Sequence, residues 1–130
     1  MVNKRKVLVV DDEIHIVHVV AIKLRNNGYD VISVDNGSDA YQLACEHEPN
    51  IIVTDLQMPN MTGLELIKKL ADNENTKNIP VILLTARDYS DEKQQDGSKI
   101  AQYLTKPFSP KELLKCIQNI LYEKVMTPNG

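Results

Sequence analysis

Five side chains that could catalyse a reaction or bind a ligand stand at the ends of short apolar runs. Asp11 and Asp12 follow the first run, Asp55 follows the third, Thr85 ends the fourth and Lys106 ends the fifth. If these ends converge, three carboxylates share one cleft, where two unit charges ~5 Å apart repel by about 3 kcal/mol at an effective dielectric of ~20. Lys106 can offset part of this repulsion. A divalent cation offsets it better, and an all-oxygen set of carboxylates with room for water and phosphate suits Mg²⁺.

A site that combines a metal, a carboxylate, a lysine and a hydroxyl is suited to phosphoryl transfer onto the carboxylate. Positioning and charge neutralisation dominate that reaction, so little other chemistry is required of the protein. We expect Asp55 to be the nucleophile, and Asp12, assisted by Asp11, to hold the metal. The Lys106 ammonium and the Thr85 hydroxyl would each contact an oxygen of the phosphoryl group.

The elements that must position these side chains alternate along the chain. Runs rich in Val and Ile occur at residues 6–10, 31–34, 51–54, 81–84 and 102–105, and segments of helical length lie between and after them. Runs that are apolar on both faces are typical of parallel strands covered by helices on either side. Five strands alternating with five helices predict a doubly wound α/β domain, in which ligands bind beyond the carboxyl ends of the strands.

Two helix starts have a clear local signature. Thr62 and Glu65, like Ser109 and Glu112, have the Ser/Thr-x-x-Glu form of a capping box. Pro110 stands at the first position of the second predicted helix, where its missing N–H costs no hydrogen bond. In the first helix, the three-to-four spacing predicts a core stripe and leaves further apolar residues off that face. The predicted stripe consists of Ile14, Val17, Ala21 and Leu24, and the residues left over are Ile16, Val19 and Ile22.

Composition limits the class of protein. A chain of 130 residues fits one domain, and 42% hydrophobic with 25% charged residues indicates a globular fold. The formal net charge is −3 and no basic block exceeds residues 4–6, so we expect no nucleic-acid surface on this domain. No apolar run approaches the roughly 18 residues that span a bilayer, and the start lacks a long apolar signal segment. We therefore expect no membrane contact and a cytoplasmic location.

The two cysteines and the end of the chain add little chemistry. Cys45 and Cys116 lie far apart without a CxxC pattern, which favours small half-buried hydrophobes over a zinc site or a disulfide. Helical periodicity is lost past about Glu123, so residues 1–123 are expected to form the domain. Residues 124–130 are read either as a C-terminal tail or as the start of a truncated linker.

Four motifs in order, each at the end of a predicted strand, carry a specific resemblance. They are VVDDE at residues 9–13, DLQMPNMTG at 55–63, LTAR at 84–87 and YLTKPF at 103–108. Together they resemble the receiver domain of bacterial two-component response regulators, over about residues 4 to 123. The resemblance implies a flavodoxin-like sheet of order 2-1-3-4-5, a cis Lys106–Pro107 bond, and phosphorelay signalling with a sensor histidine kinase or phosphotransfer protein as partner.

The resemblance also assigns roles to residues. It implies that a histidine kinase phosphorylates Asp55, and that Mg²⁺ is held by Asp12, Asp55 and the backbone carbonyl of Gln57, with Asp11 acting through water. The resemblance also implies that Thr85 and Tyr103, which stands at the family's aromatic position, form the conformational switch. The alternative for Tyr103 is a packed edge-strand residue without a switching role.

Two positions are implied to tune the lifetime of the aspartyl phosphate. They are Gln57, two residues after Asp55, and Arg87, two residues after Thr85. Long side chains at both could shield the phosphoryl group from water, and Arg87 could pair with it. The alternative is two solvated side chains at the mouth of a pocket.

One region departs from the family. Residues 88–101 stand where receivers usually carry an amphipathic fourth helix, but residues 90–99 have no large apolar side chain. A short helix needs such packing to persist. We therefore predict that the fourth helix is short, frayed or displaced.

Three classes of function stay open at this point. The first is a phosphorylation-controlled receiver, a monomer or weak dimer, which catalyses its own phosphorylation and dephosphorylation but no reaction of an external substrate. The second is a degenerate receiver that only binds partners, which the intact set of Asp11, Asp12, Asp55, Thr85 and Lys106 argues against. The third is a small Mg²⁺-dependent phosphatase, for which no general acid or substrate pocket is evident.

The apolar residues left over on the first helix would pack beside the last helix or form a kinase-docking or dimer patch.

Overall fold

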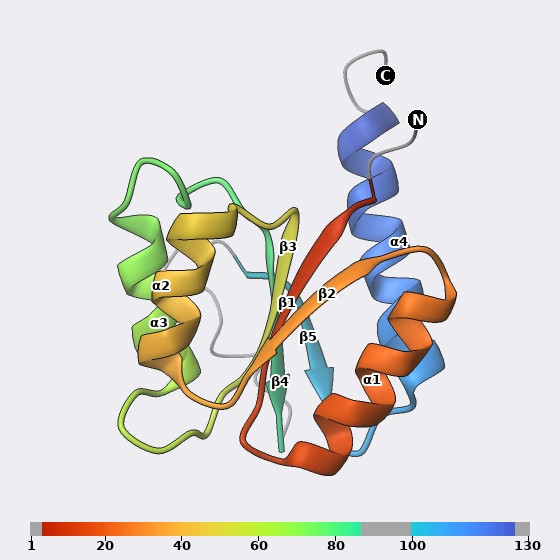
Figure 1. The fold of residues 1–130 in the computed structure, drawn as a ribbon, viewed down its shortest axis with the longest axis horizontal. Coiled ribbons are helices and arrows are strands. Elements are labelled where there is room, and N and C mark those ends of the chain that lie inside the picture. The colour runs from red at the N-terminus through yellow and green to blue at the C-terminus, as the bar shows by residue number, and fades with distance from the viewer. Residues whose placement is uncertain (1–3, 87–99, 127–130) are drawn as a thin grey trace.

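Five parallel strands form the centre of the molecule, in the order β2-β1-β3-β4-β5 (Figure 1). The computed structural model describes residues 4–86 and 100–126. The strands of this part are β1 (Lys6–Val10), β2 (Asp30–Val34), β3 (Ile51–Asp55), β4 (Val81–Thr85) and β5 (Ile100–Thr105). The parallel sheet and its order, both predicted from the sequence, are confirmed.

Helices cover both faces of this sheet. The described residues form α1 (Ile14–Asn26), α2 (Gly37–His47), α3 (Gly63–Ala71) and α4 (Pro110–Met126). Figure 1 shows α1 and α4 on one side of the sheet and α2 and α3 on the other. The fold is therefore the predicted doubly wound, flavodoxin-like α/β class.

The inner strands are apolar on both faces because each face meets a layer of helices. In β1, Val7 and Val9 belong to the core shared with α1 and α4, whereas Leu8 and Val10 belong to the core shared with α2 and α3. Every residue of β3 and β4 is buried, while the edge strands β2 and β5 are only partly buried. The composition of each run thus matches its place in the sheet.

Both predicted capping boxes are present. The Thr62 hydroxyl accepts a hydrogen bond from the backbone N–H of Glu65 at 3.1 Å, and the Glu65 carboxylate accepts one from the Thr62 N–H at 2.8 Å. Ser109 and Glu112 make the same reciprocal pair at 3.0 and 2.8 Å, directly before Pro110 opens α4. These bonds fix where α3 and α4 begin, next to the ends of β3 and β5.

The core stripe predicted for α1 is wrong at its first position. Ile14 is 75% exposed, whereas Ala21 and Leu24 are buried as predicted, and Val20 is buried as well. Ile14 is the first residue of α1, in the turn that follows the end of β1, and the buried residues all lie in the second half of the helix. Ile16 and Val17 of the same turn are partly buried and pack against the core, so the departure from the predicted stripe is confined to Ile14.

Two further predictions meet the edges of the described residues. The weak fourth helix at 88–101 falls mostly on residues 87–99, which lie outside the described part; Ile100 and Ala101 already belong to β5. At the other end, α4 continues to Met126, past the expected domain boundary at residue 123. Residues 127–130 lie outside the described residues, so the assignment of 124–130 as tail or linker stays a prediction.

Candidate functional site

Three carboxylates meet where the order of the strands reverses, between β1 and β3. Asp11 and Asp12 lie in the loop that follows β1, and Asp55 is the last residue of β3. The backbone N–H of Asp11 donates to the carbonyl of Val34, which ties this loop to the end of β2 at 3.1 Å. One oxygen of each aspartate lies within 4.8 Å of the other two. The predicted convergence of these three side chains is therefore present, at the position where open parallel sheets bind ligands.

Lys106 reaches this cluster from the end of β5. Its backbone N–H donates to the carbonyl of Thr85 at 2.7 Å, and the bond to Pro107 is cis, as expected. Its ammonium Nζ lies 3.3 Å from Asp11 Oδ2 and 3.4 Å from Asp55 Oδ1. Lys106 and the three aspartates thus form one compact charged centre from three separate parts of the chain.

Burial disfavours the charged forms of two of these carboxylates, Asp11 and Asp55. The Asp11 side chain is fully buried and that of Asp55 is 8% exposed. Burial raises the pKa of Asp11, and burial together with the charge of Asp11 raises the pKa of Asp55, while Lys106 acts in the opposite direction on both. Burial alone would lower the pKa of Lys106, but the hydrogen bond to Glu13 and the charges of Asp11 and Asp55 raise it. Lys106 therefore stays charged, and it compensates the carboxylates only in part.

The donor set fits a hard divalent cation. Asp11 Oδ2 is buried and, among the described residues, accepts no hydrogen bond, although the Lys106 ammonium stands 3.3 Å away. A buried carboxylate oxygen without a hydrogen bond is costly unless a cation binds it. Asp11 and Asp12 also line a hollow of about 490 Å³, which gives a ligand access from solvent. Oxygen ligands with room for water are what Mg²⁺ requires.

Three of the remaining predicted site residues, Thr85, Gln57 and Tyr103, lie in the described part of the chain. Thr85 is the buried last residue of β4. Gln57 is exposed two residues after β3, and its backbone N–H lowers the pKa of Asp55, against the effect of burial. Tyr103 is half-buried in β5, opposite Leu83 of β4, and packs against the core that α2 and α3 share. Arg87 lies outside the described residues, so its tuning role stays a prediction.

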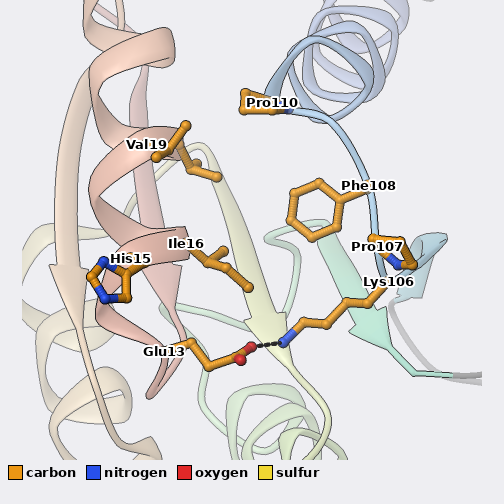
Figure 2. A pocket seen from close by; sticks show the side chains of 9 residues that line it. Glu13, His15, Ile16, Val19, Lys106, Pro107, Phe108 and Pro110 are labelled. Carbon is orange, nitrogen blue, oxygen red and sulfur yellow. Dashed lines mark hydrogen bonds and ion pairs between the residues drawn. The ribbon is translucent and has the colours of Figure 1, made fainter.

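One contact of the site was not anticipated from the sequence. Glu13 Oε1 accepts a hydrogen bond from Lys106 Nζ at 2.8 Å, and Figure 2 shows this pair at the edge of an apolar pocket of about 530 Å³ between α1 and the start of α4. The third acid of the Asp11-Asp12-Glu13 run was the available signal. Its partner could not be identified because the two residues are 93 positions apart.

Fold and site together define a doubly wound α/β domain with an acidic centre and a paired lysine at the carboxyl ends of its strands. The sequence model of the response regulator receiver domain matches residues 7–118. The chain therefore belongs to the response regulator receiver family, as the four motifs indicated.

Individual relatives agree with this family. The chain is 37% identical, over 123 residues, to the phosphate regulon transcriptional regulatory protein PhoB of Pseudomonas aeruginosa, covering 93% of this chain and 53% of PhoB. It thus spans about half the length of the curated relatives that it matches. The chemotaxis response regulator CheY4 of Vibrio cholerae has a similar structure, with a TM-score of 0.84 and 32% identity, over 91% of this chain and 99% of that one.

A third relative bears on the metal. The receiver domain of a Pseudomonas aeruginosa sensor histidine kinase, solved with a magnesium ion coordinated in its active site cleft, has a TM-score of 0.79 and 28% identity to this chain. The match covers 90% of this chain and 97% of that one. Receiver folds of this kind therefore occur both in response regulators and in kinases.

Among the helices described here, none combines the length and the hydropathy that a membrane span needs.

Proposed function

We propose that Asp55 is the phosphoryl acceptor of a two-component phosphorelay. The observation that carries the proposal is the meeting of the buried Asp11 and Asp55 and the exposed Asp12 with the Lys106 ammonium in one centre. The donor is the phosphohistidine of a sensor histidine kinase or a phosphotransfer protein. A carboxylate oxygen of Asp55 attacks phosphorus, a P–O bond forms, the P–N bond breaks, and its electron pair stays on the imidazole nitrogen of the donor.

Each residue of the centre has a role in this transfer. The Lys106 ammonium pairs with one phosphoryl oxygen, and the Thr85 hydroxyl donates to another. Asp11, Asp12, Asp55 and the backbone carbonyl of Gln57 are the groups that would hold Mg²⁺. When bound, Mg²⁺ supplies positive charge that offsets the carboxylates and the transferring phosphoryl group. Asp55 is 8% exposed, so the group is accepted at a site with little bulk water around the reacting oxygen.

The same site gives a route from phosphorylation to signalling. A phosphoryl group on Asp55 adds charge beside the end of β4, and Thr85 is the residue of that strand placed to move toward it. Tyr103 lies in the next strand, half-buried, and turns inward when Thr85 moves. Gln57 and Arg87 adjust how fast water removes the phosphoryl group.

The domain acts as a phosphorylation-controlled receiver, either alone, in a phosphorelay, or as the input half of a longer protein. It turns over no external substrate, binds no nucleic acid itself, and acts in the cytoplasm as a monomer or weak dimer. Mg²⁺ and the phosphohistidine protein are its partners.

Incubation with Mg²⁺ and acetyl phosphate, followed by intact mass measurement, tests the proposal. The wild type is expected to gain one phosphoryl group, and Asp55→Asn to gain none. Asp30→Asn is the matched control, because Asp30 is an exposed aspartate at the first residue of β2, away from the strand ends that carry the site; it should gain the group as the wild type does.

Each other outcome favours a different class of protein. No mass gain in the wild type would support a receiver that only binds partners. Turnover of acetyl phosphate that survives in Asp55→Asn would support an enzyme with another catalytic group.

A further inference from the structure

Glu13 occupies the position that precedes α1, but its side chain does not cap that helix. Its backbone carbonyl accepts the first hydrogen bond of α1 from Val17, and its backbone N–H donates to Asp11 Oδ1 at 2.9 Å. The side chain makes no hydrogen bond to the backbone of α1. It extends instead toward the end of β5, where Figure 2 shows it meeting Lys106 below Ile16 and Phe108. The backbone of Glu13 is thus structural, and its carboxylate is free for another role.

The Glu13 carboxylate holds the Lys106 ammonium more closely than the acidic cluster does. Lys106 Nζ is 2.8 Å from Glu13 Oε1, against 3.3 Å from Asp11 and 3.4 Å from Asp55. A charge-assisted N–H···O bond is usually about 2.7–2.9 Å long, so of the three contacts only the one with Glu13 lies in the range of a strong hydrogen bond. The ammonium therefore rests against the carboxylate that lies outside the three-aspartate set.

The two sides of this contact differ in their exposure to water. The Glu13 side chain is 58% exposed and that of Lys106 is 18% exposed. An ion pair with an exposed partner is weak enough to break, and changes an equilibrium by roughly two- to fivefold. The contact thus has the strength of an adjustable restraint and not of a permanent structural bond.

We propose that Glu13 is a positioning residue that restrains Lys106 in the unphosphorylated domain and slows phosphoryl capture at Asp55. The inference rests on the proposed function, because Lys106 matters here as the cation that meets the incoming phosphoryl group. Glu13 competes with that group for the same ammonium, so phosphorylation draws Lys106 toward Asp55 at the expense of the Glu13 contact. Glu13 acts only through Lys106 and does not touch the transferred group.

The test compares initial rates of phosphorylation by acetyl phosphate at low donor concentration with saturating Mg²⁺. In this reaction an Asp55 oxygen forms the new P–O bond, the P–O bond to acetate breaks, and acetate leaves with the electron pair. Glu13→Gln removes the competing charge and is expected to raise the rate about two- to fivefold. Glu13→Asp keeps the charge but shortens the side chain so that it no longer reaches Lys106, and should raise the rate to a similar extent.

Asp30→Asn is the control for general charge. Asp30 is an exposed carboxylate at the first residue of β2, away from the strand ends that carry the site, and it forms no ion pair with Lys106 among those of the described residues. Its removal should change the rate much less than either Glu13 variant. A rate in Glu13→Asp equal to the wild type, or an equal rise in Asp30→Asn, would show that only net charge matters and overturn the inference.

A second background tests whether Glu13 acts through Lys106. Lys106→Gln is expected to be phosphorylated slowly, and adding Glu13→Gln to it should leave that rate unchanged. An effect of Glu13→Gln that persists in Lys106→Gln would indicate a structural role for Glu13 instead. Both Glu13 variants keep the backbone bonds of this position, and thermal melting checks their folding. A wild type that is never phosphorylated defeats the proposed function and the inference with it. If the wild type is phosphorylated and both Glu13 variants react at the same rate as the wild type, the inference fails but the proposed function stands.

Discussion

Asp55 is held where its own negative charge is disfavoured. Burial and the neighbouring charge of Asp11 raise its pKa, and Lys106 offsets only part of the effect. A raised pKa means that the folded chain binds the proton more tightly than the unfolded chain does, so the ionised carboxylate costs stability near neutral pH. Such a cost at a single residue is typical of functional sites, where a ligand later supplies the missing compensation.

The Asp55→Asn substitution should therefore stabilise the metal-free protein. The amide keeps the shape of the side chain and removes one charge of the cluster. Relief of about 1 kcal/mol would raise the melting temperature by roughly 3–5 °C for a domain of this size. Calorimetry or circular dichroism with a chelator present measures this, and Asp30→Asn serves as the surface control. An Asp55→Asn variant that melts below the wild type would contradict the electrostatic description of the centre.

The same carboxylate predicts a pH dependence with a definite sign. Because the pKa of Asp55 is raised in the folded state, proton binding to Asp55 stabilises the fold. This stabilisation is complete below the unfolded-state pKa of about 4, and it is lost as the pH rises through the folded-state pKa. Without metal, the difference in stability between Asp55→Asn and the wild type should shrink as the pH falls from neutral toward about 4. Urea unfolding of both proteins across this range measures it. A difference that grows on acidification would refute the predicted sign.

At the scale of the elements, the start of α3 is pressed against the end of β3. A Cβ atom at Gly63 would lie 2.5 Å from the carbonyl oxygen of Asp55 and 3.0 Å from Leu83 Cδ1, and the Gly63 N–H donates to the carbonyl of Leu56 at 2.8 Å. Only glycine allows the capped helix to begin this close to the acceptor strand. The packing of α3 thus determines where the Asp55 backbone sits.

Gly63→Ala is expected to disturb both the fold and the site. The added methyl group must push the helix start or the Asp55 backbone away, at a cost of about 1–3 kcal/mol. The displacement should also weaken Mg²⁺ binding, because Asp55 moves relative to the aspartates that follow β1. Thermal melting and a Mg²⁺ titration followed by NMR test this. Gly28→Ala is the comparison: Gly28 lies in a turn distant from Asp55, its φ of 92° disfavours alanine, and an added Cβ there would contact no other atom. A Gly63→Ala protein with unchanged melting and Mg²⁺ affinity would contradict the account.

How much the sequence predicts depends on the range of the interactions. The capping boxes at Thr62 and Ser109, and the placement of Asp55 and Lys106 at strand ends, were predictable because they follow from local patterns and from the rule for parallel sheets. The exposure of Ile14 was not, because it depends on how the first residue of α1 lies against the core, which the three-to-four spacing does not determine. The Glu13–Lys106 contact depends on side-chain reach across 93 positions of the chain, which no local pattern encodes.

At the scale of the whole molecule, the sheet assembles three chain segments into one charged centre. The residues after β1 and at the ends of β3 and β5 converge although they are far apart in sequence. Ligand binding there should therefore stabilise the entire fold and not one loop, because an ion that binds only the folded chain shifts the unfolding equilibrium.

Mg²⁺ is accordingly expected to stabilise the wild type globally. At a concentration one hundred times its Kd, the gain in unfolding free energy should be about 2.7 kcal/mol. Asp12→Asn removes one ligand and should lose most of the gain at the same concentration, whereas Asp30→Asn should retain it. Urea unfolding with and without Mg²⁺ measures each value. Equal gains in Asp12→Asn and the wild type would place the ion elsewhere.

The most direct measurement of the central claim identifies the residue that carries the phosphoryl group. After treatment with acetyl phosphate and Mg²⁺, borohydride reduces an aspartyl phosphate to homoserine, and peptide mass spectrometry locates the converted residue. The account predicts homoserine at position 55 and at no other aspartate, with conversion dependent on Mg²⁺. Conversion at Asp11 or Asp12, or a phosphoryl group that borohydride does not remove from the acceptor, would contradict it.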